Sequence, residues 1–347
     1  MTCTDTRDAR ATVNQIRQLE LAGCEIVRVA VPDMEAANAL PDIKQGISIP
    51  LVADIHFDYR LALAALESGV DGLRLNPGNI RDPKKIKAVV KAAKERAVPI
   101  RIGVNAGSLP RERDAASAPR PARDRADDTV NGMVQLALDQ VKLLEELDFD
   151  LIKISVKSFD VPTTIEAYRR IAQAVPYPLH LGITESGTPW AGSIRSAVGI
   201  GNLLYMGIGD TLRVSLTGDP VEEVRVAYEI LKSLDLRQRG PVMISCPTCG
   251  RTEIDLVGIA RQVEERLQTI GAPIKVAVMG CVVNGPGEAR EADVGIAGGG
   301  GRAVLFRHGE IVRTVDEADL LPTLMKAIDE VAANWQKGTG QESATDE

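Results

Sequence analysis

Aromatic residues are scarce in this chain, and Phe, Trp and Tyr together make up 3% of its 347 residues. So few aromatic rings leave little surface on which nucleic acid bases can stack. Basic residues are also in the minority, with 41 Lys and Arg against 48 Asp and Glu, which argues against binding to nucleic acid or to anionic membranes. No apolar run approaches the about 20 residues that span a bilayer, and the polar N-terminus does not resemble a signal peptide. These absences predict a cytoplasmic protein.

Cysteine is the other scarce residue, and its five copies are too few and too widely spaced for a disulfide framework. Three of them form a pattern: Cys246 and Cys249 stand in C-x₂-C, and Cys281 follows just before the bend G-P-G. Each lies beside Pro or Gly, where the backbone can turn tightly. In a reducing compartment this pattern indicates a metal-binding or redox-active site more often than a structural one.

The number of ligands separates the candidate metals. Structural zinc sites close with four protein ligands, but His308 falls in a predicted hairpin, and Cys3 and Cys24 belong to the other domain. Three thiolates with an open or oxygen-ligated fourth position suit a [4Fe-4S] cluster in which one iron does chemistry. Glu288 is the nearby carboxylate that can fold back to that iron. From the pattern alone, zinc and cysteines that bind nothing remain alternatives.

Between residues 25 and 218 one pattern repeats: a short β-branched run, a polar turn and an amphipathic segment. This alternation predicts an α/β fold with βαβ units and a parallel sheet, and seven such units nearly complete a (β/α)₈ TIM-type barrel. The missing first strand would precede Met1, because a seven-stranded barrel would leave two unpaired edges. We therefore expect that the chain as given begins too late or was truncated. The predicted strands are Glu25–Val31, Pro50–His56, Gly72–Gly78, Pro99–Gly107, Leu151–Ser158, Leu179–Glu185 and Thr211–Gly218.

A domain boundary falls in the stretch Asp235–Pro241. We predict a substrate-binding barrel over residues 1–238, a small α/β cluster domain over residues 239–335, and a disordered tail over residues 336–347, which is too polar to fold alone. Within the barrel, Pro110–Asp128 has no apolar period and predicts an exposed loop, either simply solvated or a lid over the barrel mouth. The predicted elements of the second domain are a strand with the C-x₂-C, a helix over Glu253–Ile270, a strand over Ile274–Gly280, the glycine run Gly298–Gly301, a hairpin through His308 and Gly309, and a helix over Asp316–Trp335.

Polar residues at alternate positions mark the inner face of each predicted barrel strand, because the other face packs on helices and is apolar. A purely structural barrel is filled by branched apolar side chains, whereas this one is filled with cations and has few carboxylates. Buried unpaired charges cost several kcal/mol each, so an external polyanion is the simplest partner, and guanidinium groups suit phosphate oxygens. The alternative is that Asp54, Glu185 or carbonyl groups pair each cation. The converging cations are Arg28, Arg74, Arg101, Lys153, Lys157 and Arg213.

Two histidines and two carboxylates are the candidates for proton transfer in the barrel. His56 and His180 are each either catalytic or hydrogen-bonded interior histidines. Glu185 stands at the C-terminal end of its strand, where barrel enzymes place catalytic groups, and is the best candidate for a general acid. Asp54 is the second.

Long motifs run in fixed order through most of the chain, and such motifs are highly specific. They are V-A-D-I-H-F at Val52–Phe57, R-L-N-P-G-N-I at Arg74–Ile80, R-I-G-V-N-A-G-S at Arg101–Ser108, L-G-I-T-E at Leu181–Glu185, G-I-G-D-T-L-R-V-S-L at Gly207–Leu216, C-P-T-C-G-R at Cys246–Arg251 and G-C-V-V-N-G-P-G-E at Gly280–Glu288. With them the sequence closely resembles the 4-hydroxy-3-methylbut-2-en-1-yl diphosphate synthases of the non-mevalonate isoprenoid pathway, in their bacterial two-domain form.

The resemblance implies an iron–sulfur oxidoreductase that reduces 2-C-methyl-D-erythritol 2,4-cyclodiphosphate by two electrons, opens its ring and releases water. It implies a [4Fe-4S] cluster held by Cys246, Cys249, Cys281 and Glu288, with Glu288 yielding one iron to a substrate oxygen. Flavodoxin or ferredoxin would supply electrons to a homodimer in which one subunit's cluster domain caps the other's barrel.

The resemblance also implies roles for the barrel residues. Glu185 would donate a proton, and Asn284, beside the cluster, would contact the substrate. The predicted substrate-binding residues are Arg28, Arg74, Arg101, Asn105, Lys153, Arg213, Asp54 and His56.

Two other functions remain open. A non-redox iron–sulfur hydratase acting on a phosphorylated small molecule would need the same cluster but no electron donor. A zinc-stapled binding module would be colourless and insensitive to air. Visible absorbance after anaerobic reconstitution separates the zinc module from the other two, and a requirement for reductant separates those.

Overall fold

The structure is a computed structural model of the chain, and it describes residues 1–56, 58–75, 82–109, 122–281, 287 and 289–342. Contacts within the chain divide it into two units, Met1–Leu236 and Arg237–Glu347, close to the predicted boundary after residue 238. None of the helices in the described ranges is long and apolar enough to cross a membrane.

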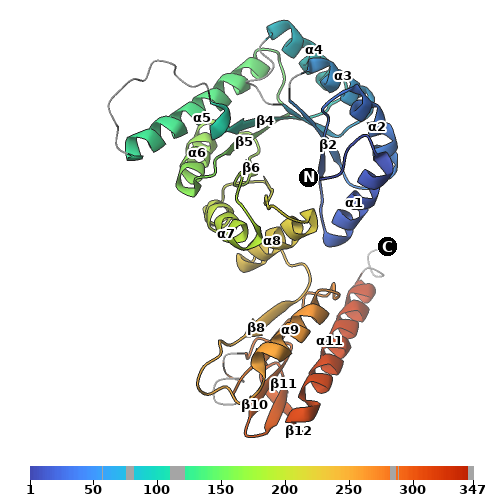
Figure 1. Cartoon of the computed structure of the whole chain (residues 1–347), viewed down its shortest axis with the longest axis vertical. Coiled ribbons are helices and arrows are strands. Elements are labelled where there is room, and N and C mark those ends of the chain that lie inside the picture. The colour runs from blue at the N-terminus through green and yellow to red at the C-terminus, as the bar shows by residue number, and fades with distance from the viewer. Residues whose placement is uncertain (57, 76–81, 110–121, 282–286, 288, 343–347) are drawn as a thin grey trace. The chain divides into compact units, whose positions relative to one another are not determined.

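Strands and helices alternate through the first unit (Figure 1). Parallel ladders join β1 to β5 in chain order, a second ladder joins β6 to β7, and a bridge between Ile154 and Leu179 connects the two sets. Every strand lies inside a predicted strand range, because short β-branched runs between polar turns were the signal for them. The strands are β1 (Val27–Ala30), β2 (Leu51–Ile55), β3 (Gly72–Leu75), β4 (Ile100–Asn105), β5 (Ile152–Lys157), β6 (His180–Leu181) and β7 (Thr211–Leu212).

Most helices of the first unit begin at an aspartate whose carboxylate accepts a hydrogen bond from a backbone N–H of the first turn, as at Asp8, Asp82 and Asp219. Proline follows Asp82 and Asp219 at the first helical position, where its missing N–H costs nothing. The helices are α1 (Ala9–Ala22), α2 (Met34–Gln45), α3 (Tyr59–Glu67), α4 (Pro83–Glu95), α5 (Ala122–Glu145), α6 (Val161–Ala174), α7 (Pro189–Tyr205) and α8 (Pro220–Ser233).

The predicted loop Pro110–Asp128 is wrong over its last part. Residues 110–121 lie outside the described residues, but α5 begins at Ala122, and Asp127 on this helix forms an ion pair of 2.8 Å with Arg170 of α6. The prolines before Ala122 and the absence of an apolar period suggested a loop, yet Ala and Arg are good helix formers and Asp is favourable in a first helical turn.

The start of the chain lies between the first and the last strand of this unit. The Thr2 N–H donates to the carbonyl of Arg28 on β1 at 3.1 Å. The amino group of Met1 lies 4.0 Å from a carboxylate oxygen of Glu223 on α8, which follows β7. Residues at the N-terminus therefore contact the first strand and the helix that follows the last strand.

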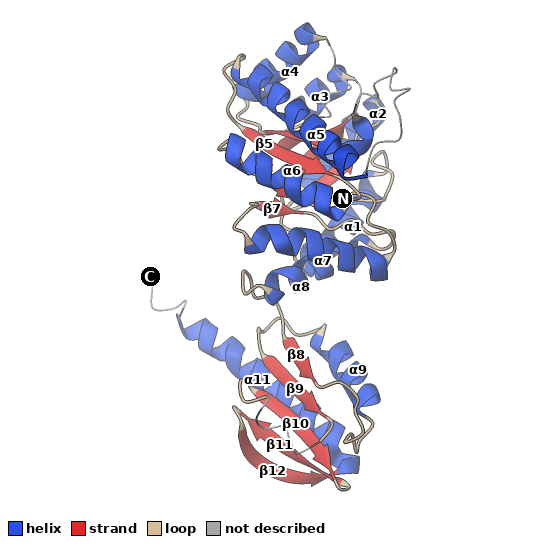
Figure 2. Cartoon of the chain, turned by 90° about the vertical axis from the view of Figure 1, so that its left-hand side faces the viewer, coloured by secondary structure: helices blue, strands red, loops and turns tan. Residues whose placement is uncertain are grey.

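The second unit is a five-stranded sheet with helices (Figure 2). The strand order is β12-β11-β10-β9-β8, in which β8, β9 and β10 are parallel and β10, β11 and β12 antiparallel. Residues alternate between two clusters along β9: Val276 and Val278 pack with helices α9 and α11, and Ala277 and Met279 pack with Phe306. The elements are β8 (Val242–Ser245), α9 (Leu256–Leu267), β9 (Lys275–Met279), β10 (Val294–Gly299), β11 (Arg302–Arg307), β12 (Glu310–Asp316) and α11 (Leu320–Glu342).

Two hairpins follow from glycine at positive φ. Gly300 and Gly301, with φ of 62° and 72°, form the two-residue turn between β10 and β11, and His308 and Gly309 form the turn between β11 and β12. Two residues at positive φ are what a tight type I′ hairpin requires. The last helix continues to Glu342, past the predicted start of the tail at residue 336.

Candidate active site

A row of polar side chains crosses four parallel strands of the first unit. Asp54 on β2 is the register partner of Arg74 on β3, Arg74 of Arg101 on β4, and Arg101 of Lys153 on β5. Side chains at paired positions of neighbouring strands point to the same face of a sheet. The pleat therefore aligns these four residues, as the alternating sequence pattern predicts.

Asp54 is the buried carboxylate that anchors this row. Its oxygens lie 3.0 Å from a guanidinium nitrogen of Arg74, 3.4 Å from Nε of Arg28 and 3.5 Å from Nε2 of His56. Burial alone would raise the pKa of Asp54, but the hydrogen bond from His56 and the charges of Arg28 and Arg74 offset it and hold the pKa well below its usual range. Asp54 is therefore a structural anion that orients two cations, which does not suit it to act as a general acid.

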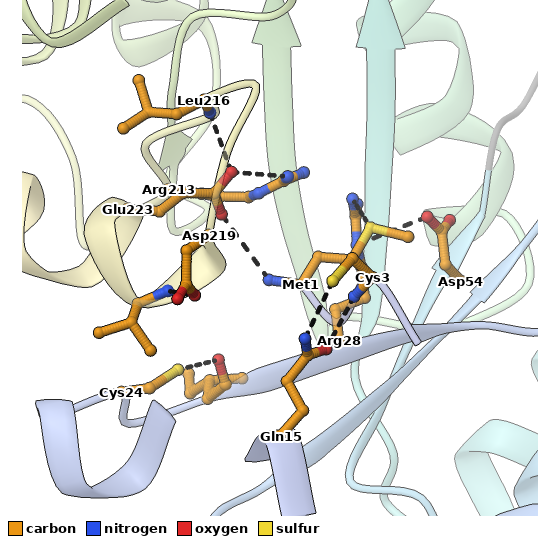
Figure 3. A network of polar contacts seen from close by, with 12 residues as sticks. Met1, Cys3, Gln15, Cys24, Arg28, Asp54, Arg213, Leu216, Asp219 and Glu223 are labelled. Atoms are coloured by element: carbon orange, nitrogen blue, oxygen red, sulfur yellow. Dashed lines mark hydrogen bonds and ion pairs between the residues drawn. The ribbon is translucent and has the colours of Figure 1, made fainter. Parts of the chain in front are cut away.

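A second carboxylate, Glu223 on α8, was not among the residues predicted from the sequence. One oxygen lies 3.5 Å from the guanidinium of Arg213 and accepts a hydrogen bond of 2.9 Å from the Leu216 N–H, and the other faces the amino group of Met1 (Figure 3). The prediction considered only alternating strand positions, and Glu223 lies on a helix. The signal available was the acidic pair in D-P-V-E-E directly after the last strand.

The remaining cations have no such partner. Among the described residues, no carboxylate lies within 4 Å of Arg101, Lys153 or Lys157, and Nε of Arg101 is buried without a hydrogen-bond partner. Burial lowers the pKa of Arg101 to about 9 and that of Arg28 to about 10, so both remain charged near neutrality. Burial, with the charges of Arg101 and Arg213, holds the pKa of Lys157 well below its ordinary value. The described inner face thus has more cations than carboxylates.

Two glycines make room for the charged ends of these side chains. A Cβ at Gly103 would lie 2.7 Å from Nε of Arg74, and a Cβ at Gly182 would lie 2.6 Å from Nζ of Lys157. Any larger residue at either position would displace a cation. The absence of a side chain at these two positions is therefore part of how the barrel holds its charges.

The two barrel histidines have different surroundings. His56 is half-exposed and supports Asp54, as above. His180 is partly buried, its Nδ1 lies 2.9 Å from the hydroxyl of Thr211, and its Nε2 has no hydrogen-bond partner among the described residues. Burial and the neighbouring charge of Lys157 hold the pKa of His180 well below its usual value, so the ring is neutral. The environment of His180 does not resemble that of a histidine poised to exchange protons near pH 7.

Glu185 lies in the loop that follows β6, and its side chain is exposed. Its φ of 54° is in the left-handed region, which a residue with a side chain adopts only when its surroundings impose it. The loop is held on both sides: the Thr184 N–H donates to the Ser158 carbonyl at 3.3 Å, and the hydroxyl of the buried Ser186 donates to the Ser215 carbonyl. Such strain in a supported loop beside a charged barrel is typical of a functional position.

The other predicted residues are partly described. Asn105 ends β4, is half-buried, and is the register partner of Lys157. The predicted residues Asn284 and Glu288 lie outside the described residues, as does residue 76, which the inner-face pattern also included.

In the second unit, the three cysteines of the motif lie at one edge of the sheet. Cys246 follows the end of β8 and Cys281 follows the end of β9, and parallel strands end at the same edge. The Gly280 N–H donates to Sγ of Cys246 at 3.2 Å. Thr252 joins the C-x₂-C loop to this edge: its hydroxyl accepts from the Cys249 N–H at 3.2 Å, and its methyl group would lie 3.0 Å from a Cβ at Gly280.

The chemistry of these thiols suits a thiolate-bound group. All three are free of disulfides, and hydrogen bonds from the backbone and side chain of Arg251 lower the pKa of Cys249, which favours its thiolate. Within the described ranges no three His, Cys, Asp or Glu side chains gather closely enough to hold a metal ion, and Glu288, the predicted fourth ligand, lies outside those ranges. The donors are on adjacent loops and of the right type, without a closed ligand shell.

The parallel strands alternating with helices, the row of cations on one face of the sheet and the separate cysteine-bearing sheet define a two-unit α/β protein. Two family profiles match in this order: residues 1–228 match the one described as the GcpE TIM-barrel domain, and residues 242–330 match the one described as the GcpE protein C-terminal domain. The TIM-type fold that the sequence predicts is therefore confirmed.

Curated relatives give the family a fuller name. The chain is 63% identical over 328 residues to 4-hydroxy-3-methylbut-2-en-1-yl diphosphate synthase (flavodoxin) of Dehalococcoides mccartyi strain BAV1, with 94% of this chain and 91% of the relative covered. Two proteins of the same name also match. The one from Geobacter sulfurreducens is 61% identical, with 95% of this chain and 91% of the relative covered. The one from Bacillus cereus strain Q1 is 57% identical, with 100% of this chain and 92% of the relative covered. The chain belongs to the GcpE family of 4-hydroxy-3-methylbut-2-en-1-yl diphosphate synthases, which confirms the resemblance found in its sequence motifs.

Proposed function

We propose that this chain reduces 2-C-methyl-D-erythritol 2,4-cyclodiphosphate to 4-hydroxy-3-methylbut-2-enyl diphosphate in isoprenoid precursor biosynthesis. The reaction takes up two electrons and two protons, opens the ring at a carbon–oxygen bond to phosphate, and releases one water. The observation that carries the proposal is the excess of cations over carboxylates on the barrel's inner face, in a chain whose relatives share this activity in their name.

The barrel, residues 1–238 in this proposal, binds the diphosphate. Arg101 and Lys153 offer the charge that the described carboxylates do not neutralise, and Arg28, Arg74 and Arg213 are held toward the same space by Asp54 and Glu223. Asn105 contributes an amide to the substrate site, and His56 hydrogen-bonds to Asp54, the carboxylate that anchors the row. A bound diphosphate supplies the negative charge that this interior lacks, which offsets the cost of burying the cations.

The second domain, residues 239–335, carries the redox chemistry. Cys246, Cys249, Cys281 and Glu288 would hold a [4Fe-4S] cluster, which when bound supplies the two electrons. Flavodoxin, which the relatives' names include, is the proposed donor, and ferredoxin is its substitute. The free cysteines suit the reducing cytoplasm.

Glu185 supplies the proton in this proposal. Its exposed carboxyl is aimed by a strained backbone at the end of β6 where barrel enzymes place catalytic groups, and it protonates the hydroxyl oxygen that leaves as water. Asn284 contacts the substrate from the cysteine domain.

We further propose that the enzyme is a homodimer whose site is shared between subunits. Helix α7 supports this: its exposed face is apolar, with Trp190 81% and Tyr205 84% exposed and Ile194 and Val198 between them. Together these side chains offer on the order of 600 Å² of apolar surface, near the about 800 Å² that each partner of a stable complex buries. Trp190 and Tyr205 stand at opposite ends of the helix with small residues between, so two antiparallel copies of α7 would pair each Trp with a Tyr.

Anaerobic reconstitution with iron and sulfide tests the function directly. We expect a brown protein with four irons per chain at most, absorbance near 400 nm, and turnover of the cyclodiphosphate only with reduced flavodoxin or dithionite. Turnover without reductant would favour the hydratase, and a colourless protein that binds zinc instead of iron would refute both iron–sulfur functions.

A further inference from the structure

The side chain of Arg195 on α7 points to the Glu185 loop. It is the only charged residue of this helix, its guanidinium donates to the Ser186 carbonyl at 2.7 Å, and among the described residues no carboxylate lies within ion-pair distance of it. An arginine with a backbone carbonyl as its partner keeps its full charge, so it contributes a directed hydrogen bond without neutralisation.

A ring on the neighbouring loop fixes the direction of this guanidinium. The central carbon of the Arg195 guanidinium lies 4.9 Å from the centroid of the Phe159 ring, and Phe159 follows the end of β5. The stacked guanidinium therefore spans the loops after β5 and β6. A flexible ammonium would make the hydrogen bond but not the planar stack.

The backbone next to Ser186 passes close to this side chain. Gly187 has a φ of 104°, and a Cβ there would lie 3.3 Å from the Arg195 guanidinium. The Gly187 carbonyl accepts from the Thr217 N–H at 2.9 Å. The hydroxyl of Ser186 also donates a hydrogen bond to the Ser215 carbonyl. The contacts of Arg195, Thr217 and Ser215 thus restrain the peptide groups after Glu185 from three sides.

We infer that Arg195 is a positioning residue for Glu185: by holding the Ser186 carbonyl it keeps Glu185 in its left-handed conformation and fixes the direction of its carboxyl. This inference rests on the proposed function, in which Glu185 is the proton donor. Arg195 itself does not touch the substrate. Because the diphosphate is bound by other cations, losing Arg195 affects the chemical step and leaves substrate affinity intact.

The test compares Arg195→Met, Glu185→Gln and the double variant in reconstituted holoenzyme, with Arg169→Met on the exposed face of α6 as the matched control. We expect Arg195→Met to lower kcat at least about tenfold at unchanged KM, and Arg195→Lys to recover part of it. The double variant should match Glu185→Gln alone, because a residue that acts only through Glu185 has no further effect once that carboxyl is gone. Arg169→Met should retain wild-type kcat.

Hydrogen exchange supplies a readout independent of turnover. In Arg195→Met the Thr217 amide should exchange faster, while the melting temperature stays within a few degrees of wild type. If Glu185→Gln retains full activity, the proton-donor role is wrong. If Glu185→Gln is impaired but Arg195→Met has wild-type kcat, or the two losses multiply in the double variant, the positioning role is wrong and the proposed function stands.

Discussion

The barrel's inner face and the cysteine edge of the second unit are built in opposite ways. On the inner face the fold fixes three of the proposed substrate-binding cations: Asp54 orients Arg28 and Arg74, Glu223 orients Arg213, and Gly103 leaves space for the guanidinium of Arg74. At the cysteine edge the thiols lie on neighbouring loops, and within the described ranges no three metal-ligating side chains gather there. In the proposed function, the barrel cations are therefore oriented by protein contacts, whereas the cysteines would be brought together by the group that they bind.

The largest effect should come from the cysteine edge. Cys281→Ser should lose the cluster and with it all reductive turnover, because the loop after β9 then offers no thiolate. Glu288→Gln should keep iron and visible absorbance but lose much of the activity. Iron analysis and visible absorbance after anaerobic reconstitution measure the cluster content of each variant, and a turnover assay measures its activity. Cys3→Ser is the control that should keep both the cluster and the activity. Equal iron and equal activity in the Cys281 and Glu288 variants would contradict the ligand assignment.

Two arginines of the same row should separate binding from stability. Arg101→Met removes a buried cation without a described carboxylate partner, so we expect kcat/KM to fall about a hundredfold or more while the melting temperature holds or rises. Arg74→Met leaves Asp54 with one fewer partner and should lower the melting temperature. Steady-state kinetics and thermal unfolding give both numbers. A melting temperature that falls equally in both variants would mean that Arg101 is also structurally paired.

Mixed dimers test whether the two regions act across subunits. Arg101→Met fails in the barrel and Cys281→Ser fails in the cysteine domain, so each homodimer is inactive. In a shared-site dimer, co-expressed chains should regain about one quarter of wild-type activity, since half of the dimers then contain one intact site. The heterodimer is isolated with two different tags. An inactive purified heterodimer would place the complete site within one chain, and Trp190→Glu should abolish the recovery by separating the subunits.

The smallest effect is a change in acid stability. The folded-state pKa of Asp54 lies below its ordinary value, so its stabilising contribution is complete above the unfolded pKa of about 4 and is lost as the pH falls through that value toward the folded pKa. Urea unfolding between pH 6 and pH 3 should therefore show a steeper loss in wild type than in Asp54→Asn. Asp139→Asn, at an exposed position of α5, should follow wild type. Parallel curves for wild type and Asp54→Asn would show that Asp54 is not stabilised by its cations.

Much of the fold followed from local patterns. Strand runs such as Pro99–Gly107 predicted where β4 lies, and the pair His308 and Gly309 predicted a tight turn, because both signals depend on neighbouring residues alone. The inner-face cations were predictable for the same reason, since alternation assigns them to one face. Glu223 was missed because its role depends on how α8 packs near β7, which no local pattern carries. The first turn of α5 was missed because its charges, and the prolines that precede it, suit a loop equally well.

The two hairpins of the second unit also bear on the order in which it folds. Strands β10, β11 and β12 are joined by two-residue turns, so their contacts are local and close quickly, whereas β8 pairs with β9 only after the whole of α9 has been spanned. We therefore expect β8, which leads directly into Cys246, to join the sheet last, and pulsed hydrogen exchange should show late protection at Val242–Ser245. The chain would then keep its C-x₂-C loop accessible for metal insertion until the rest of the sheet has formed.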